Sequence, residues 1–112
     1  MEMNDEYIDV NGALKRIGGN MGLFKKLLGR YVEGKSFEAL SDAALAGNLE
    51  EAARLSHTLK GVSSNLSLMK VAALSTEIEQ LFKNGSDFSG CLAELKDACA
   101  VTDGLIAEII NS

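Results

Sequence analysis

The only histidine of the chain, His57, is its strongest candidate for chemistry. A neutral imidazole is a nitrogen nucleophile near neutral pH, because the reference pKa of histidine is about 6.5. In a helix, His57 would lie roughly 160° from Leu55 and Leu59, the neighbours that we expect to point into a core. The imidazole is therefore predicted to face outward, with one ring nitrogen open to a reaction partner.

Four other residues would share the helix face of this histidine. They are Arg54 one turn before it, Lys60 and Gly61 one turn after it, and Ser64 two turns after it. Lys60 can place an ammonium group near phosphoryl oxygens, and Arg54 can add charge from farther away. Gly61 removes a side chain beside the imidazole, at a cost of about 1 kcal/mol relative to alanine. Ser64 is small and would keep the pocket open, so the spacing predicts a phosphohistidine site.

Each of these residues also has a structural interpretation. A surface histidine usually has no chemical role, and a glycine inside a helix often marks a close contact between helices. The chain would then be a helical protein–protein interaction module without phosphoryl chemistry. A small hydrolase or metal protein that uses His57 with a carboxylate such as Glu50 is a further alternative. One histidine among scattered acids is a poor ligand set, so we expect no metal site.

The elements that would position His57 are helices. The chain has 112 residues, 46% of them hydrophobic, and no proline that would interrupt a helix. Apolar residues recur at steps of three and four between short Gly, Asn and Ser interruptions. Helices are expected over 9–16, 20–46, 48–66, 68–82 and 86–109, beginning at caps such as Asp9, Asn20 and Asn48. Gly34 weakens the second of these segments, which is either one bent helix or two.

In the segment that carries His57, the expected core stripe is Ala52, Leu55, Leu59, Val62 and Leu66. Short connections between long amphipathic helices favour antiparallel neighbours. The predicted fold is therefore all-α, an antiparallel up-down four-helix bundle with an additional short N-terminal helix. We expect a single domain over residues 1–112, with a core from about 7 to 110.

Charge and composition exclude several classes of function. The net charge is −5 and no basic cluster is present, which argues against binding to nucleic acid or to an anionic membrane surface. The acidic start over residues 1–6 lacks the basic leader and apolar run of a signal peptide, so we expect a cytoplasmic protein. Cys91 and Cys99 would lie about 12 Å apart in one helix, too far for a disulfide, and are expected to be packed thiols.

The stretch 57–64 resembles the signature of the histidine-containing phosphotransfer (HPt) domain family: a histidine, an apolar residue two positions on, Lys-Gly, and then small residues. Further similarity, over roughly residues 7–110, lies in Ile8-Asp9, Ala13-Leu14, Gly18-Gly19-Asn20, the 43–48 turn, Ala73-Leu74 and Ile78-Glu79. Two positions depart from the family pattern. Ser67 stands where a glycine is frequent, which bears on the shape of the following turn, and Ser56 stands where alanine is frequent.

The resemblance implies that His57 relays a phosphoryl group. The ring nitrogen farther from the backbone would attack a phosphorylated aspartate in line, and the group would later pass to the aspartate of a second receiver. The partners implied are receiver domains of response regulators and of hybrid sensor histidine kinases. Such a chain is a phosphocarrier without kinase activity of its own. It binds no cofactor, and the Mg²⁺ is expected on the receiver.

Docking of a receiver should use an apolar rim around His57. Leu14 and Ile17, in the first short helix, and Met21 are the candidates for this rim, although the same residues also suit the core. Transient signalling contacts are often small, so a modest apolar patch would suffice. We expect the chain to be a monomer.

Overall fold

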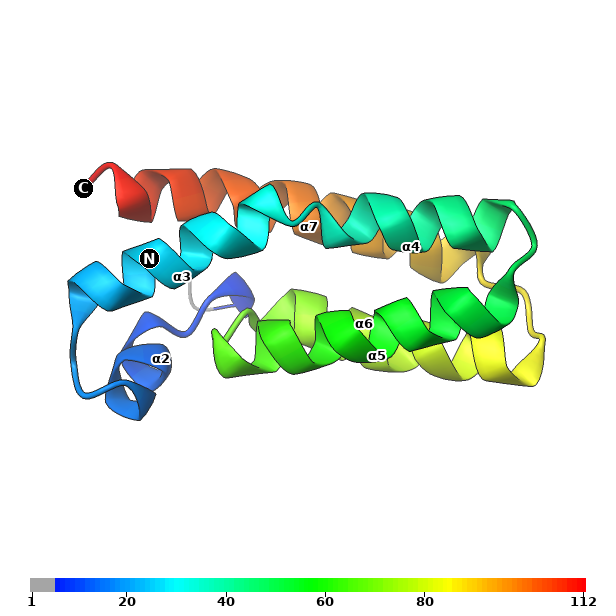
Figure 1. The fold of residues 1–112 in the computed structure, drawn as a ribbon, viewed down its shortest axis with the longest axis horizontal. Helices are drawn as coiled ribbons and strands as arrows, with labels where there is room; N and C mark the ends of the chain where they lie inside the picture. Colours follow the sequence, from blue (N-terminus) through cyan, green and yellow to red (C-terminus); the bar gives the residue numbers. More distant parts are fainter. Residues whose placement is uncertain (1–5) are drawn as a thin grey trace.

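The computed structural model describes residues 6–112, whose regular secondary structure is helical (Figure 1). The helices are α2 (Val10–Arg16), α3 (Met21–Glu33), α4 (Ser36–Leu45), α5 (Leu49–Asn65), α6 (Met69–Asn84) and α7 (Ser89–Ile110). The all-α prediction is confirmed. In Figure 1, α3 and α4 follow one another as an interrupted rod, and this rod, α5, α6 and α7 alternate in direction along the molecule. The short α2 lies beside the end where α3 begins.

Three helices begin at the caps that the sequence predicted. Three side-chain oxygens accept a hydrogen bond from the backbone N–H three residues on: Asp9 from Gly12 (3.0 Å), Asn20 from Leu23 (2.9 Å) and Asn48 from Glu51 (3.3 Å). Gly47 and Gly85 follow α4 and α6 with φ of 83° and 66°, a conformation that glycine adopts without steric cost. Local signals therefore set most of the helix boundaries.

Two helix boundaries differ from, or were left open by, the sequence prediction. The segment 20–46 forms two helices, because Lys35 between them adopts a left-handed conformation with φ of 47°. The last helix begins at Ser89, slightly later than the predicted 86–87. Asp87 instead holds the preceding turn, since its carboxylate accepts from the backbone N–H (3.0 Å) and the hydroxyl (2.8 Å) of Ser89.

The core lies between the rod, α5, α6 and α7. Its fully buried side chains include Phe24, Leu28, Leu40, Leu59, Ile78, Leu95 and Ile106. Cys91 and Cys99 are free and buried, as predicted. The contact between α5 and α6 is the most extensive between any two helices, and α5 also packs against α4. The helix with His57 is therefore held from two sides.

The predicted core stripe of α5 is partly wrong. Val62 is 38% exposed and Leu55 is only half-buried, whereas Ser56 and Ser63 are buried. The two serine hydroxyls donate to carbonyl oxygens one turn earlier, at 2.8 Å for Ser56 and 2.6 Å for Ser63. Because these small side chains satisfy their own hydroxyls, α5 can turn them toward its neighbour and leave Val62 outside.

Helix α2 is fixed to the C-terminal end of α5. The Nη1 atom of Arg16 donates to the carbonyl oxygens of Ser64 (3.0 Å) and Asn65 (2.8 Å) at the end of α5, where the i+4 partners of the helix interior are missing. The Ser64 carbonyl also accepts from the backbone N–H of Ser67 at 3.1 Å. The backbone N–H of Asp9 donates to the carbonyl of Ser67 at 2.9 Å. These bonds place α2 next to the helix that carries His57.

Candidate functional site

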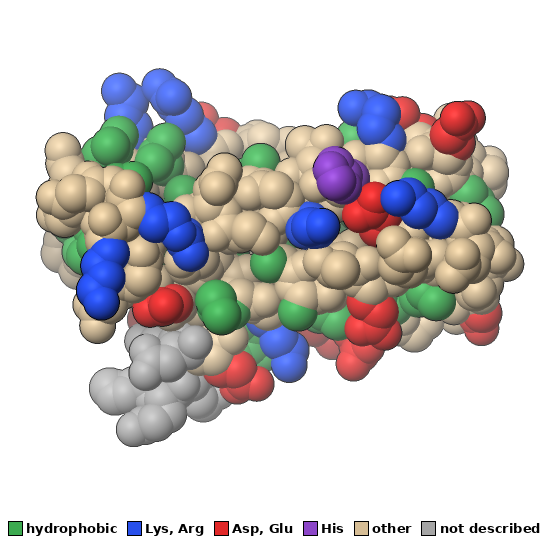
Figure 2. Space-filling view, turned by 90° about the horizontal axis from the view of Figure 1, so that it is seen from below, with side chains coloured by type: hydrophobic (Ala, Val, Ile, Leu, Met, Phe, Trp, Pro, Cys, Tyr) green, Lys and Arg blue, Asp and Glu red, His purple; other side chains and the backbone are tan. Residues whose placement is uncertain are grey.

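His57 lies on the open side of α5, and its side chain is 69% exposed. This agrees with the outward orientation predicted from the helix period. Figure 2 shows the imidazole standing on the surface with basic side chains on several sides of it. A group of another molecule can therefore reach the ring.

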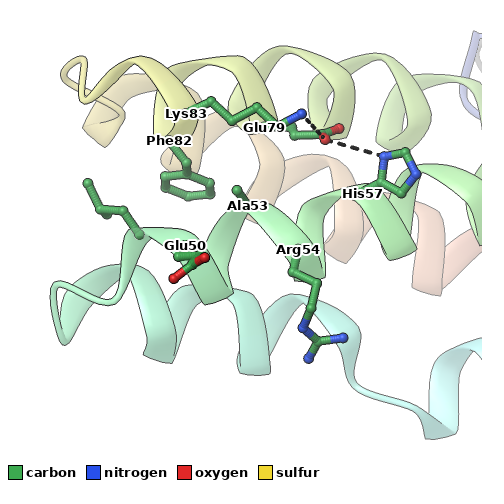
Figure 3. A pocket seen from close by; sticks show the side chains of 8 residues that line it. Glu50, Ala53, Arg54, His57, Glu79, Phe82 and Lys83 are labelled. Carbon is green, nitrogen blue, oxygen red and sulfur yellow. Dashed lines mark ion pairs between the residues drawn. The ribbon is translucent and has the colours of Figure 1, made fainter.

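A buried carboxylate contacts one nitrogen of this ring. Oε2 of Glu79, on α6, lies 3.3 Å from Nδ1 of His57 and 3.0 Å from Nζ of Lys83 (Figure 3). The side chain of Glu79 is only 7% exposed. The close packing of α5 against α6 brings the three side chains together.

The surroundings of Glu79 keep its carboxyl group ionised near neutral pH. Burial alone would raise the pKa of Glu79, because a low-polarity environment disfavours the charged form. Hydrogen bonding and charge attraction from Lys83, and then from His57, outweigh burial and lower this pKa below its usual value. Near neutral pH, the site thus presents a negative charge next to the imidazole.

The Glu79 carboxylate distinguishes the two nitrogens of His57. A carboxylate accepts hydrogen bonds, so it favours the tautomer in which Nδ1 carries the hydrogen. The lone pair then resides on Nε2, the nitrogen farther from the backbone. An imidazole nucleophile requires a free lone pair on one ring nitrogen and a hydrogen bond at the other that fixes the orientation of the ring.

The other predicted site residues of α5 differ in their positions. Gly61 and Ser64 are exposed, as is His57, while Lys60 is half-buried. A side-chain methyl group added to Gly61 would have no heavy atom within 4 Å outside its own helix backbone and chain neighbours. Gly61 therefore does not mark a close contact between helices, and packing of the fold does not require glycine at this position.

Arg54 makes a local ion pair instead of a contact with the imidazole. Its guanidinium donates from Nε (2.8 Å) and Nη2 (2.6 Å) to the carboxylate of Glu51, and this hydrogen bonding lowers the pKa of Glu51. Figure 3 shows the guanidinium directed away from His57. A direct role of Arg54 in holding a phosphoryl group stays a prediction that would require its release from Glu51.

Two different surfaces flank His57 along α5. Toward the start of the helix is an open hollow of about 660 Å³, lined in part by Leu49, Ala53 and Phe82. Toward its end lies α2, where the predicted docking residues Leu14 and Ile17 are half-buried against the core and Met21, at the start of α3, is 38% exposed. The structure therefore leaves parts of these three side chains accessible, and their docking role stays a prediction.

Sequence reasoning missed Glu79 and Lys83 as parts of the site. A signal was present, because Glu79 follows Ile78 in the buried stripe of α6, where a carboxylate requires a partner. Lys83 stands four residues later, at the spacing of a helical ion pair. What the sequence could not supply was the register of α6 against α5, which sets Glu79 beside His57.

Within 6–112, no group of three or more histidine, cysteine, aspartate or glutamate side chains is arranged to hold a metal ion. Over the same residues, no helix has the length and apolarity that crossing a bilayer requires.

Comparison with known protein families gave a match to part of the chain. The family model described as Hpt domain matches residues 34–109, from the junction of α3 and α4 almost to the end of α7. Neither a curated protein nor a solved structure matched the chain. The matched part includes His57 and Glu79, and it leaves out α2 and α3.

Proposed function

The chain belongs to the Hpt domain family, and from this premise we propose that His57 accepts a phosphoryl group from one receiver domain and passes it to another. Membership of the family makes the chain a phosphocarrier of two-component signalling rather than a kinase. The observation that carries the choice of residue is the contact of 3.3 Å between Nδ1 of His57 and Glu79, which leaves Nε2 on an exposed ring.

The proposed step needs no base. The Nε2 lone pair attacks the phosphorus of an aspartyl phosphate, forming an N–P bond as the bond from phosphorus to the aspartate oxygen breaks. The aspartate leaves as a carboxylate, and Nδ1 keeps its hydrogen throughout. The product ring carries a positive charge, which the Glu79 carboxylate stabilises. Transfer to a second receiver reverses these changes.

The remaining residues of the face would act on the phosphoryl oxygens or on access to them. Lys60 is proposed to offset the negative charge of the arriving group, and Arg54 would add charge if it released Glu51. Gly61 and Ser64 are proposed to keep the space beside Nε2 open. Lys83 contacts the same oxygen of Glu79, Oε2, as the imidazole does, so it acts through the carboxylate.

The partner would supply what this chain lacks. A receiver domain is expected to hold the Mg²⁺ that neutralises charge during transfer, so no cofactor is assigned to this chain. We place the relay in the cytoplasm, whose reducing conditions suit the two buried free thiols.

Incubation with a phosphorylated receiver domain and Mg²⁺ tests this proposal. We expect a phosphoryl adduct on the chain that is labile in acid and stable in alkali, and we expect none on the His57→Gln variant. Persistence of the label on that variant would refute the assignment of the residue. The helical interaction module would be favoured by a different result. In that result, the wild-type chain acquires no label, and the wild type and His57→Gln bind receivers equally well.

A further inference from the structure

The charges of this protein are unevenly divided among its helices. Helices α2 and α3 together carry five basic residues against one acidic residue, a net charge of +4. Helices α4 and α7 carry one basic residue against six acidic ones, a net charge of −5. The first pair is thus strongly cationic in a chain whose total charge is −5.

One of the two cationic helices, α2, is bonded to the end of the helix that carries His57, and α3 packs against α2. Arg16 bonds the carbonyl oxygen of Ser64, which is seven residues and about 10 Å along α5 from His57. The exposed basic side chains of this region are Lys15, Arg16, Lys26 and Arg30, called here the cationic surface. In Figure 2, basic and hydrophobic side chains gather at the α2–α3 end of the face that displays the histidine.

A receiver domain is expected to be acidic around its phosphorylated aspartate. Its aspartate must be accompanied by Mg²⁺, a hard cation held through carboxylate oxygens, and by the charge of the phosphoryl group itself. We infer that the cationic surface docks the acidic rim around this aspartate and steers the receiver onto His57. This inference rests on the proposed function and adds to it the region of the chain that selects the partner.

The surface has two properties that suit steering. Opposite potentials on two proteins raise the association rate by about 10- to 1000-fold at low salt, without requiring close-fitting contacts. The surface also lies outside residues 34–109, the part that the family model matches, so its charge belongs to this chain rather than to the matched pattern. Receivers with basic surfaces should accordingly be rejected.

The test compares two charge-reversed variants in transfer from a receiver domain phosphorylated with acetyl phosphate. Lys15→Glu with Lys26→Glu alters the cationic surface, and Lys70→Glu with Lys96→Glu changes the net charge equally on α6 and α7. At 0.1 M salt, we expect the first variant to raise KM at least tenfold with kcat unchanged, and the control to stay within twofold of wild type. At 1 M salt, where the Debye length falls from about 10 Å to about 3 Å, the difference should largely disappear.

Several outcomes would overturn the inference. Equal effects of the two variants would mean that net charge, not this surface, controls transfer, and an unchanged KM would exclude steering altogether. Wild-type dimers that dissociate in the Lys15→Glu/Lys26→Glu variant would assign the surface to a second copy. Binding to phosphatidylserine vesicles, lost in that variant while KM is unchanged, would assign it to a membrane. In each case a normal acid-labile label on His57 would leave the proposed function standing, whereas absence of the label at saturating receiver would refute it.

Discussion

At the scale of single residues, the contact between His57 and Glu79 turns a surface histidine into an oriented one. The imidazole is exposed, but the carboxylate below it is buried and held by Lys83 at 3.0 Å. A buried carboxylate is costly unless it has partners, so the position of Glu79 is closely determined by the Lys83 ammonium and the imidazole N–H of His57. The carboxylate in turn determines which nitrogen of His57 faces solvent.

Substitution of Glu79 should slow phosphoryl transfer in a graded way. Glu79→Ala removes both the acceptor for Nδ1–H and the negative charge, and we expect a loss of about tenfold or more in transfer rate. Glu79→Gln keeps an oxygen acceptor but loses the charge, so its rate should lie between those of the alanine variant and the wild type. Rapid-quench measurement of transfer checks this order, and a wild-type rate in Glu79→Ala would show that the carboxylate is only structural.

The same residue should affect stability at low pH. The pKa of Glu79 is lower in the folded protein than its ordinary value of about 4.3, so its ionisation stabilises the fold above that pH. As the pH falls through the folded-state pKa, this contribution is lost. We expect the free energy of unfolding of the wild type to fall more than that of Glu79→Gln between pH 6 and pH 3, measured by urea denaturation. A larger fall in the variant would contradict the lowered pKa.

Gly61 should trade stability against function. Alanine is favoured over glycine within a helix by up to about 1 kcal/mol, and the added methyl group meets open space, so Gly61→Ala should stabilise the free protein. No atom of the imidazole lies within 4 Å of this methyl group, so it would act on the approaching receiver, and the proposed role of Gly61 predicts that transfer slows at least tenfold. Gly104→Ala, also in open space but on α7, is the matched control and should stabilise without slowing transfer. An unchanged transfer rate in Gly61→Ala would end the argument that Gly61 keeps the site open.

Among the elements of the fold, the turn between α5 and α6 has one residue in an unfavourable backbone conformation. Ser67 adopts a left-handed conformation with φ of 57°, at the position where the family resemblance led us to expect glycine. Its side chain is buried, and its hydroxyl oxygen has no hydrogen-bond partner within the described residues. The turn keeps its shape because both ends are fixed, by the ending helix α5 and by the bond from Asp9 to the Ser67 carbonyl.

Ser67→Gly should therefore stabilise the protein. Glycine relieves a left-handed conformation that costs other residues about 1–2 kcal/mol, and it removes a buried hydroxyl without a partner. The greater freedom of glycine in the unfolded chain offsets part of this gain, so we expect a net increase of about 1 kcal/mol. Thermal denaturation measures it, and phosphoryl transfer should be unchanged. Destabilisation by this substitution would mean that the serine is not strained.

At the scale of the whole molecule, the sequence was informative wherever the signals were local. Caps such as Asn20 and Asn48 act within one turn, so they placed the starts of α3 and α5 correctly. The break at Lys35 and the exposure of Val62 depend on how neighbouring helices pack, which apolar spacing alone does not contain. Glu79 required the relative register of two helices, and for that reason Glu79 and Lys83 were found only in the structure.

The arrangement of the helices is consistent with a phosphoryl site that uses a single histidine. The bundle holds His57 on a helix that is supported from two sides, and the cationic helices lie at one end of the same face. The reacting group, its orientation and the proposed docking charge thus come from different helices. Under the proposed function, this division would let a small chain relay a phosphoryl group while the partner supplies the metal ion.

The most direct test of the account is a nitrogen-15 spectrum of the single imidazole before and after transfer from a phosphorylated receiver. Because the chain has one histidine, its two ring nitrogens can be assigned without ambiguity. We expect the free protein to carry its imidazole hydrogen on Nδ1, and the phosphorylated protein to show phosphorus coupling at Nε2 with Nδ1 still protonated. Phosphorylation at Nδ1, or a spectrum that does not change when the chain acquires the label, would contradict it.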